Sequence, residues 1–250
     1  MMRRARTLMT ALVCLCLPRA AKPAALRALG HSVAAGVRIG PSLVLTERLA
    51  LAKGASIGAF NFLALRRLLL REGAAIGSMN VIKRGQSALL KRRAAIGNRN
   101  VILRGWTPSA IRSSLLKIGY NSKITSSHYL EMTECISVGD NSVVAGVRSQ
   151  IWTHGFVHDR TGPGRKLVIG PVVIGDNVYV SSGCIINCGL RIANAVSIGS
   201  GASVAKSLEE EGVYVAQPLR HLRRTPDERV AGLTRIDGAT PMDTYFSRVP

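Results

Sequence analysis

The segment "VIGDNVYVSSGCIINCGLRIANAVSIGSGASV", residues 173–204, returns an aliphatic side chain at every sixth position. An α-helix repeats every 3.6 residues and a half-buried strand every two, so neither element alone explains this spacing. A short fixed period indicates one small structural unit that is repeated along the chain. The aliphatic anchors of this segment are Ile174, Val180, Ile186, Ile192, Ile198 and Val204.

The same spacing extends through most of the chain. Small residues such as Gly40 and Gly58 follow the anchors and tolerate the tight corners that join short strands. Three units make one coil with three flat faces, and stacked coils bury the anchors in an axial column. The expected inward anchors before residue 174 are Val33, Ile39, Leu45, Leu51, Ile57, Leu63, Leu69, Ile76, Ile82, Leu90, Ile96, Ile102, Ile118, Ile124, Leu130, Val138, Val144 and, after a break, Val168.

This pattern predicts an all-β fold, a parallel β-helix of hexapeptide repeats. We expect the β-helix to occupy residues 31–206 in roughly nine coils, with a loop excursion at 151–167. Residues 1–30 and 207–250 are expected to be short helical extensions. A β-sandwich would instead show period-2 alternation with turns about every 8–12 residues.

Positive charge is concentrated in the first half of the chain. Residues 1–130 hold 22 of the 34 Lys and Arg residues but, among acids, only Glu47 and Glu72. Such asymmetry favours an anionic partner, either a membrane surface or a phosphate-bearing substrate, over a merely soluble basic surface. We expect no nucleic-acid partner, because no nucleic-acid-binding signature is present and aromatic residues are few.

The N-terminus combines basic residues with a short apolar run, Leu8 to Leu17. This run is too short to span a bilayer as a helix. It resembles a signal peptide, but the following "LPRAAKP" is a poor cleavage site, so we favour an uncleaved helix on the membrane or on the end of the domain. Five cysteines form no even disulfide framework, which favours a reducing compartment. We therefore expect a cytoplasmic protein, peripheral to the inner face of the membrane.

The repeat breaks between Gln150 and Val168, where Gly162, Pro163 and Gly164 indicate a loop that leaves the coil. The break carries His154 and His158. Loops on a rigid scaffold commonly carry function, and a neutral imidazole is well suited to act as a general base near pH 7.

From "WTHGFVHD" (152–159), the segment 173–204, "SIGSGASVAKS" (197–207) and "VYVAQPLRHLRR" (213–224), the chain resembles the hexapeptide-repeat acyltransferases, in particular sugar and polysaccharide O-acetyltransferases. The resemblance implies a left-handed β-helix, a homotrimer, acetyl-CoA as acyl donor, a saccharide acceptor from the cell envelope or linked to a lipid, and no metal. It places the catalytic base on His154. The residues that it implies around the cofactor are Tyr179, Ser182, Ser200, Ala205, Lys206, Arg220 and Arg223.

Two other functions are compatible with the sequence. A β-helix that has lost activity would serve only as a scaffold. A zinc hydratase of the γ-carbonic anhydrase type would need three histidines that converge across subunits, for which His154, His158 and the less convincing His128 are available. On the acetyltransferase interpretation, His158 contacts substrate. The sequence does not identify the acceptor sugar, and it does not restrict the donor strictly to acetyl.

Overall fold

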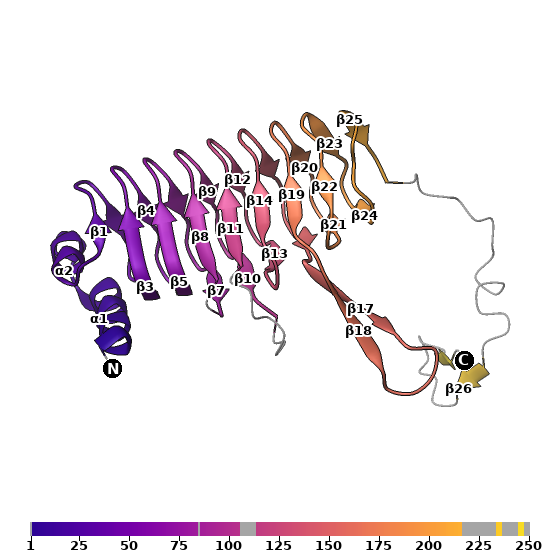
Figure 1. The fold of residues 1–250 in the computed structure, drawn as a ribbon, viewed down its shortest axis with the longest axis horizontal. Helices are drawn as coiled ribbons and strands as arrows, with labels where there is room; N and C mark the ends of the chain where they lie inside the picture. Colours follow the sequence, from indigo (N-terminus) through magenta and orange to yellow (C-terminus); the bar gives the residue numbers. More distant parts are fainter. Residues whose placement is uncertain (1, 85, 106–113, 217–233, 237–244, 248–250) are drawn as a thin grey trace. The chain divides into compact units, whose positions relative to one another are not determined.

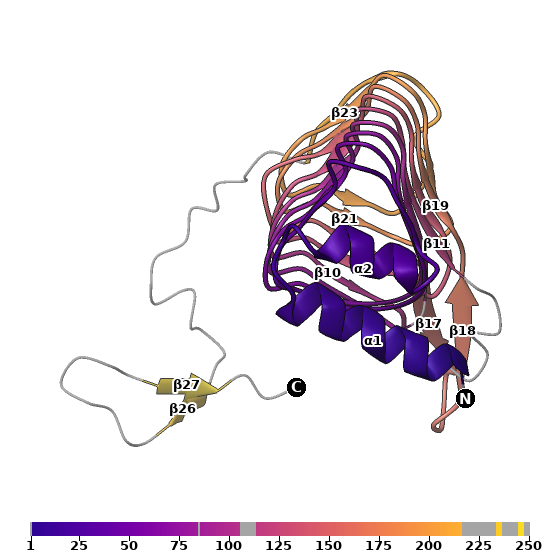
Figure 2. The same cartoon turned by 90° about the vertical axis from the view of Figure 1, so that its left-hand side faces the viewer.

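The computed structural model describes residues 2–84, 86–105, 114–216, 234–236 and 245–247. The chain divides into two compact units, residues 1–216 and 217–250. The first unit is a prism of stacked three-sided coils (Figures 1 and 2). In the second unit the described residues are β26 (Thr234–Ile236) and β27 (Tyr245–Ser247), which pair antiparallel.

The first face of the prism is a parallel sheet of nine strands. Its strands are two or three residues long, because a corner follows each of them. They are β2 (Arg38–Ile39), β4 (Ser56–Ile57), β6 (Ala75–Ile76), β9 (Ala95–Ile96), β12 (Lys123–Ile124), β15 (Val143–Val144), β20 (Tyr179–Val180), β23 (Val196–Ile198) and β25 (Gly212–Tyr214).

The second and third faces form one sheet of 14 strands. Two long strands, β3 (Leu43–Leu51) and β5 (Phe62–Leu70), run through both faces. The second face continues with β7 (Val81–Lys83), β10 (Val101–Leu103), β13 (Tyr129–Glu131), β16 (Gln150–Ile151), β21 (Ile185–Ile186) and β24 (Ser203–Val204). The third face contains β1 (Ser32–Val33), β8 (Ser87–Leu90), β11 (Leu115–Ile118), β14 (Ile136–Val138), β19 (Val172–Ile174) and β22 (Arg191–Ile192).

We call the corner between the first and second faces the first edge, that between the second and third faces the second edge, and the remaining corner the third edge. Seen from the N-terminal end in Figure 2, the chain passes from the first face at the left to the second at the bottom and the third at the right. This path is counter-clockwise as the chain recedes, so the coils are left-handed. The predicted left-handed parallel β-helix is confirmed.

Most predicted anchors are buried in the axial column, as expected from the hydrophobic effect. The predictions at Leu45 and Leu69 are wrong, because Val44 and Leu70 point inward instead. In β3 and β5 the chain passes the second edge with two successive exposed residues, which reverses the alternation of side chains. Val168 is also wrong as an anchor, since its side chain is 46% exposed on a hairpin outside the column.

Two helices lie at the N-terminal end of the prism, α1 (Met2–Cys16) and α2 (Lys22–Ala28). Figure 2 shows α2 across the open end of the coils and α1 along the side of the second face. Cys14 of α1 and Leu26 of α2 are fully buried, so both helices cover core that the first coil would otherwise expose. Neither described helix has the length and apolarity needed to cross a bilayer.

The expected helical C-terminal extension is not observed in its described residues. Beyond residue 206 these residues form β25, β26 and β27, and they contain no helix. The strand β25 pairs with β23 and so continues the first face by one more coil. For residues 207–216 the expected helix was wrong, because strands continue to stack as far as β25, although the hexapeptide pattern in the sequence ends before it.

Hydrogen-bonded side chains stack inside the first edge. Asn61 Oδ1 accepts from the backbone N–H of Asn80, Asn80 Oδ1 from Asn100, and Asn100 Oδ1 from His128. His128 Nδ1 then accepts from the backbone N–H of Ser149 at 3.1 Å. This ladder satisfies backbone groups that the corner would otherwise leave buried and unpaired.

Candidate active site

The segment that the sequence predicted as an excursion leaves the prism at the second edge. Two strands, β17 (His154–His158) and β18 (Arg165–Ile169), form an antiparallel hairpin that begins directly after the second face (Figure 1). His154 is the first residue of this hairpin, where the chain turns away from the coil. The rigid coil therefore positions the histidine, while the rest of the hairpin projects outward.

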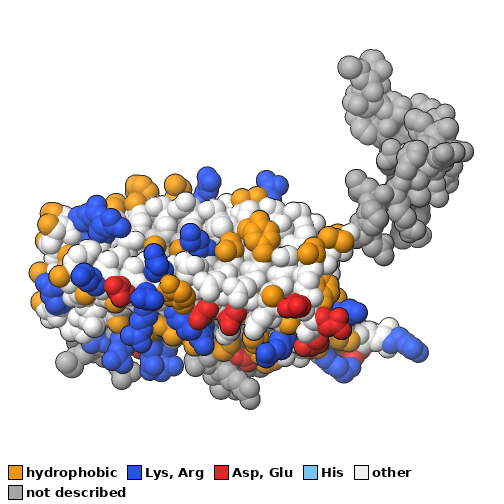
Figure 3. Space-filling model, turned by 90° about the horizontal axis from the view of Figure 1, so that it is seen from above, with side chains coloured by type: hydrophobic (Ala, Val, Ile, Leu, Met, Phe, Trp, Pro, Cys, Tyr) orange, Lys and Arg blue, Asp and Glu red, His pale blue; other side chains and the backbone are white. Residues whose placement is uncertain are grey.

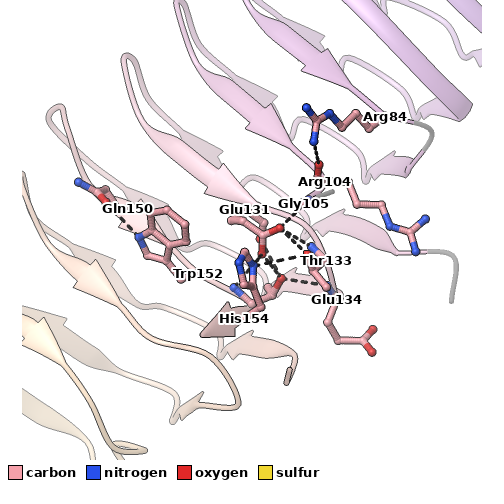
Figure 4. Close-up of polar contacts among 10 residues, drawn as sticks. Arg84, Arg104, Gly105, Glu131, Thr133, Glu134, Gln150, Trp152 and His154 are labelled. Atoms are coloured by element: carbon pink, nitrogen blue, oxygen red, sulfur yellow. Dashed lines mark hydrogen bonds and ion pairs between the residues drawn. The ribbon is translucent and has the colours of Figure 1, made fainter. Parts of the chain in front are cut away.

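His154 contacts an acid of the preceding coil at hydrogen-bond distance (Figure 4). Its Nδ1 atom lies 2.8 Å from Oε2 of Glu131, the last residue of β13. The side chain of Glu131 is 2% exposed and that of His154 is 17% exposed. Solvent is thus almost completely excluded from the carboxylate of Glu131 and reaches the pair only at the histidine.

Three further groups hold the Glu131 carboxylate in place. Thr133 Oγ1 donates to Oε1 at 2.6 Å, and Thr153 Oγ1 donates to Oε2 at 2.8 Å. The backbone N–H of Gly105 donates to Oε1 at 2.8 Å. A Cβ atom at Gly105 would lie 2.7 Å from Thr133 Oγ1 and 2.9 Å from Glu131 Oε1, so glycine is needed for this close approach.

These hydrogen bonds determine the charge of Glu131. Burial alone would raise its pKa, but donation from Thr133, His154 and Thr153 outweighs burial and holds the pKa below its usual value. An ionised carboxylate only accepts hydrogen bonds, so His154 Nδ1 carries the proton that faces it. In the neutral ring, Nε2 then has a free lone pair, and this atom has no hydrogen-bond partner among the described residues.

Aromatic side chains surround the histidine. The ring centroids of Trp152 and Phe156 lie 6.1 Å and 5.7 Å from that of His154, both with edge-on geometry. Trp152 also packs against Tyr129, at 5.2 Å between centroids, and its indole N–H donates to Gln150. The guanidinium group of Arg165 lies over the ring of Phe156, 4.7 Å from its centroid. Aromatic rings beside a base are suited to the apolar faces of a sugar ring.

His158 does not join this site. It ends β17, four residues beyond His154, where it pairs with Arg165 in the hairpin and is exposed. Four residues of extended strand cover about 13 Å, so the two imidazoles are too far apart to share a metal ion. The proposed contact of His158 with substrate stays a prediction.

The residues predicted around the cofactor lie elsewhere on the prism. Tyr179 is 49% exposed on the first face, and Ser182 and Ser200 lie on successive coils at the first edge. Ala205 and Lys206 are exposed after β24, on the last coils. Arg220 and Arg223 lie outside the described residues.

The first edge fits a slender polar chain such as the pantetheine arm. The hydroxyl of Ser182 is close to the backbone of the preceding coil, where it accepts from the N–H of Val147. A Cβ atom at Gly201 would meet no atom within 4 Å, so the backbone here is open. The described cofactor candidates therefore offer hydroxyls and accessible backbone along successive coils.

Within one chain, however, Ser182 and Ser200 do not meet the histidine, whereas Ala205 and Lys206 lie at the same edge as His154, on later coils. Ser149 marks the first edge and His154 the second, and five residues of extended chain between them cover about 16 Å. The whole second face therefore separates His154 from Ser182 and Ser200. A site that uses both edges needs a second copy of the chain.

The described residues also bear on the zinc-hydratase alternative. They contain no group of three or more His, Cys, Asp and Glu side chains that could hold a metal ion. His128, the suggested third ligand, is buried in the ladder of the first edge, where both ring nitrogens are engaged. Within one chain, His128 lies at the first edge, whereas His154 and His158 lie on the hairpin at the second edge.

Sequence reasoning found His154 but missed Glu131, Thr133, Thr153 and Gly105. The break in the repeat pointed to the histidine, whereas its partners lie in other coils. One signal was available, because Glu131 is the first acidic residue after Glu72. In the row of paired strands it lies beside Leu103, which is in turn beside Lys83.

No family model matches the chain. Over 92 residues, 37% of this chain, it is 29% identical to the galactoside O-acetyltransferase of Escherichia coli (strain K12), and the match covers 45% of that protein. The structure of the polySia specific acetyltransferase NeuO is similar, with a TM-score of 0.50 and 15% identity over 70% of this chain and 79% of that one. A hexapeptide-repeat acetyltransferase of Vibrio cholerae O1 biovar eltor, solved with acetyl coenzyme A, has a TM-score of 0.37 and 15% identity over 88% and 86% of the two chains.

The predicted resemblance to the hexapeptide-repeat acetyltransferases is confirmed by these comparisons. The shared property is the β-helix fold, and the chain is aligned with less than half of the galactoside O-acetyltransferase.

Proposed function

We propose that the protein is an acetyl-CoA-dependent O-acetyltransferase that modifies a hydroxyl of a saccharide, with His154 as general base. The observation that carries this proposal is the His154–Glu131 pair at the second edge, with Nε2 of the histidine available to an incoming hydroxyl. The similarity to a galactoside O-acetyltransferase supports the choice of reaction.

The chemistry requires a base because the pKa of a sugar hydroxyl is far above neutral. Acetyl-CoA, when bound, supplies an activated acetyl group with a good thiol leaving group, so no nucleophile of the protein is needed. His154 Nε2 accepts the proton of the hydroxyl as its oxygen becomes a nucleophile. Glu131, by accepting from Nδ1, keeps the ring in the required tautomer and stabilises the imidazolium that forms.

Acetyl-CoA would be held at the first edge and on the last coils. Ser182 and Ser200 would contact the pantetheine arm, with Tyr179 on the adjoining first face, while Ala205 and Lys206 would contact the cofactor from the second edge. Arg220 and Arg223 would contact the nucleotide end. These assignments follow the resemblance, and the open backbone at the first edge supports them.

The separation of the two edges supports a homotrimer. In a trimer with parallel axes, the first edge of one subunit can lie beside the second edge of its neighbour and so bring donor and base together. Chains that carry His154→Asn should therefore complement chains that carry Ser200→Trp when the two are unfolded and reassembled together. If sedimentation equilibrium gave an active monomer at micromolar concentration, the homotrimer would be wrong.

We also propose contact with an anionic membrane surface, which fits a lipid-linked acceptor and a peripheral location on the inner face of the membrane. The helix α1 exposes Leu8, Leu12 and Leu15 on one side, at 60%, 54% and 45%. The same helix contains Arg3, Arg4 and Arg6 and no acidic residue. On the side away from α1, Figure 3 shows Lys and Arg side chains gathered over the N-terminal coils and Asp and Glu side chains further toward the C-terminal ones. Apolar side chains on a basic helix are a combination that binds anionic lipid surfaces.

The test of the main proposal is acetyl transfer by the purified full chain. Thiol release from acetyl-CoA and mass spectrometry of a saccharide panel should both report transfer, and His154→Asn should abolish nearly all of it. A scaffold without activity is the alternative. It would bind no acetyl-CoA in calorimetry and acetylate none of the saccharides.

A further inference from the structure

Arginines line the second edge on the N-terminal side of the His154–Glu131 pair. They occupy successive coils, at the same corner from which the hairpin with His154 departs. We call this set the arginine column, and its members are Arg48, Arg66, Arg67, Arg84 and Arg104. Figure 4 shows Arg84 and Arg104 beyond Gly105 as seen from Glu131.

The column places like charges next to each other. Arg48 and Arg67 are direct cross-strand partners, and both are exposed. The guanidinium group of Arg84 donates to the backbone carbonyl of Arg104, which draws these two residues together. Like charges directly opposite in a sheet are destabilising, so this arrangement favours an anion that would lie against the column.

The chain supplies little negative charge to neutralise the column. In the described part of the chain, the guanidinium groups of Arg48, Arg66, Arg67 and Arg84 have no carboxylate partner. Glu47 lies within the column, and Glu131 and Glu134 follow on the next coil at the same edge, so the arginines outnumber the acids. Exposed arginines without a carboxylate partner, such as Arg48, Arg66 and Arg67, form a surface that recognises carboxylates or phosphates.

Part of the column lines a hollow of about 360 Å³ between α1 and the second face. Arg66 and Arg84 line it from one side, and Glu47 lines it as well. Its floor is apolar, formed by Leu45, Ala64 and Leu65. A hollow with an apolar floor and two guanidinium groups suits a sugar residue that carries an acidic group.

The spacing connects this hollow to the base. From β7, which precedes Arg84, to β16, which precedes His154, there are three steps between paired strands, about 14 Å at ~4.8 Å each, and Arg66 on β5 lies one step further. An acceptor with its hydroxyl at His154 would therefore reach Arg84 and Arg66 with the parts that extend toward the N-terminal coils.

We propose that the arginine column binds the negatively charged part of the acceptor, so that the acceptor is an acidic saccharide. This inference rests on the proposed function for the reacting end of the acceptor. The charge would be carboxylate groups along the glycan or the phosphates of a lipid-linked sugar, since both present the same chemistry to arginine.

The test measures binding without acetyl-CoA, so that it does not depend on turnover. Calorimetry at low salt would compare a hexamer of galacturonic acid, maltohexaose as the neutral oligomer, and inorganic pyrophosphate. We expect the full chain to bind at least one anionic probe tenfold or more tightly than maltohexaose. Arg66→Gln combined with Arg84→Gln should weaken that binding about tenfold. Arg71→Gln, an exposed arginine that directly follows β5 at the third edge, should change it less than twofold.

Selective binding of the galacturonic acid hexamer would assign the charge to the glycan, and selective binding of pyrophosphate would assign it to a phosphate linkage. Either result supports the inference. Equal binding of neutral and anionic probes would overturn it, and so would an unchanged double variant. A double variant that loses only its affinity for anionic vesicles would show that the column serves a membrane, which would also contradict the inference. The proposed function fails separately, by absence of acetyl transfer.

Discussion

Nδ1 of His154 lies 2.8 Å from Oε2 of Glu131, although the two residues belong to different coils of the β-helix. The hydrogen-bonded stacking of β13 and β16 fixes this distance, because it sets the offset between the two coils. The backbone of the solenoid, rather than a flexible loop, thus holds the acid and the base in register.

Replacement of His154 by Asn should remove most turnover. Asn keeps polarity and hydrogen bonding but cannot accept the proton, so kcat should fall about 10²–10⁴-fold. Acetyl-CoA affinity, measured by calorimetry, should stay within a small factor. His158→Asn is the matched control, and a strong loss of turnover in it, with near-normal turnover in His154→Asn, would transfer the role to His158.

Glu131→Gln should lower kcat about 10²-fold or more while KM for acetyl-CoA hardly changes. Gln retains the shape of Glu131 but removes the charge that stabilises an imidazolium, and it no longer fixes the tautomer of His154. Glu131→Asp, which keeps the charge at a shorter reach, should restore part of the rate. A purely structural role would predict instead that loss of activity follows loss of thermal stability, as measured by calorimetric unfolding.

Stability should decrease as the pH falls through the ordinary range of histidine. Burial lowers the pKa of His128 and of His31, and hydrogen bonds from backbone groups only partly offset this for His128. Protons therefore bind the unfolded chain more readily, and the free energy of unfolding drops as pH passes below about 6.5. Urea midpoints at pH 8 and pH 5.5 would measure the drop.

His128→Asn is the variant that isolates this effect, because Asn occupies the three preceding rungs of the same ladder. The variant should show a smaller drop between the two pH values. An identical pH dependence in wild type and variant would mean that His128 does not contribute.

Gly77→Ala should destabilise the fold. A Cβ atom there would lie 2.5 Å from the carbonyl oxygen of Gly97, on the next coil, where the backbone cannot move without breaking the sheet. We expect a loss of about 1–3 kcal/mol, the usual cost of overpacking. Gly155→Ala is a suitable control, since a Cβ atom there meets nothing within 4 Å. Similar unfolding temperatures for both variants would contradict the close-packed first face.

The full chain should float with vesicles that contain anionic lipid, and salt should weaken the binding. Leu8→Ser combined with Leu12→Ser should reduce flotation, because these two leucines are exposed on α1. Thr10, which is buried on the same helix, should be left unchanged so that α1 stays docked. Equal flotation with neutral vesicles would attribute binding to the apolar side chains alone.

The sequence predicted the coil and most of its anchors because each face of the prism takes about six residues and buries one aliphatic side chain, which produces the hexapeptide period. It failed at Leu45 and Leu69, where β3 and β5 continue around the second edge and the alternation shifts by one residue. A period of six carries no information about which corners are sharp and which are passed by a continuous strand. That property depends on the pairing of whole strands.

For the site, a local break in the pattern was enough to find His154. Its partner Glu131 could not be paired with it from spacing alone, because the lengths of the intervening turns set which residues of adjacent coils face each other. The separation of His154 from Ser182 was equally hidden, since both lie within the same repeat region and only the fold assigns them to different edges.

The hairpin β17–β18 leaves the prism at the second edge, between the second and third faces, whereas the described turns of the first edge are short. Insertions at that corner lengthen the chain without changing the register of the coils beneath. Related proteins could therefore differ in the insertions at the second edge, and so in the acceptor that they modify. The first edge would not have to change with them. In protein engineering, the same division would make the second edge the place to graft new loops.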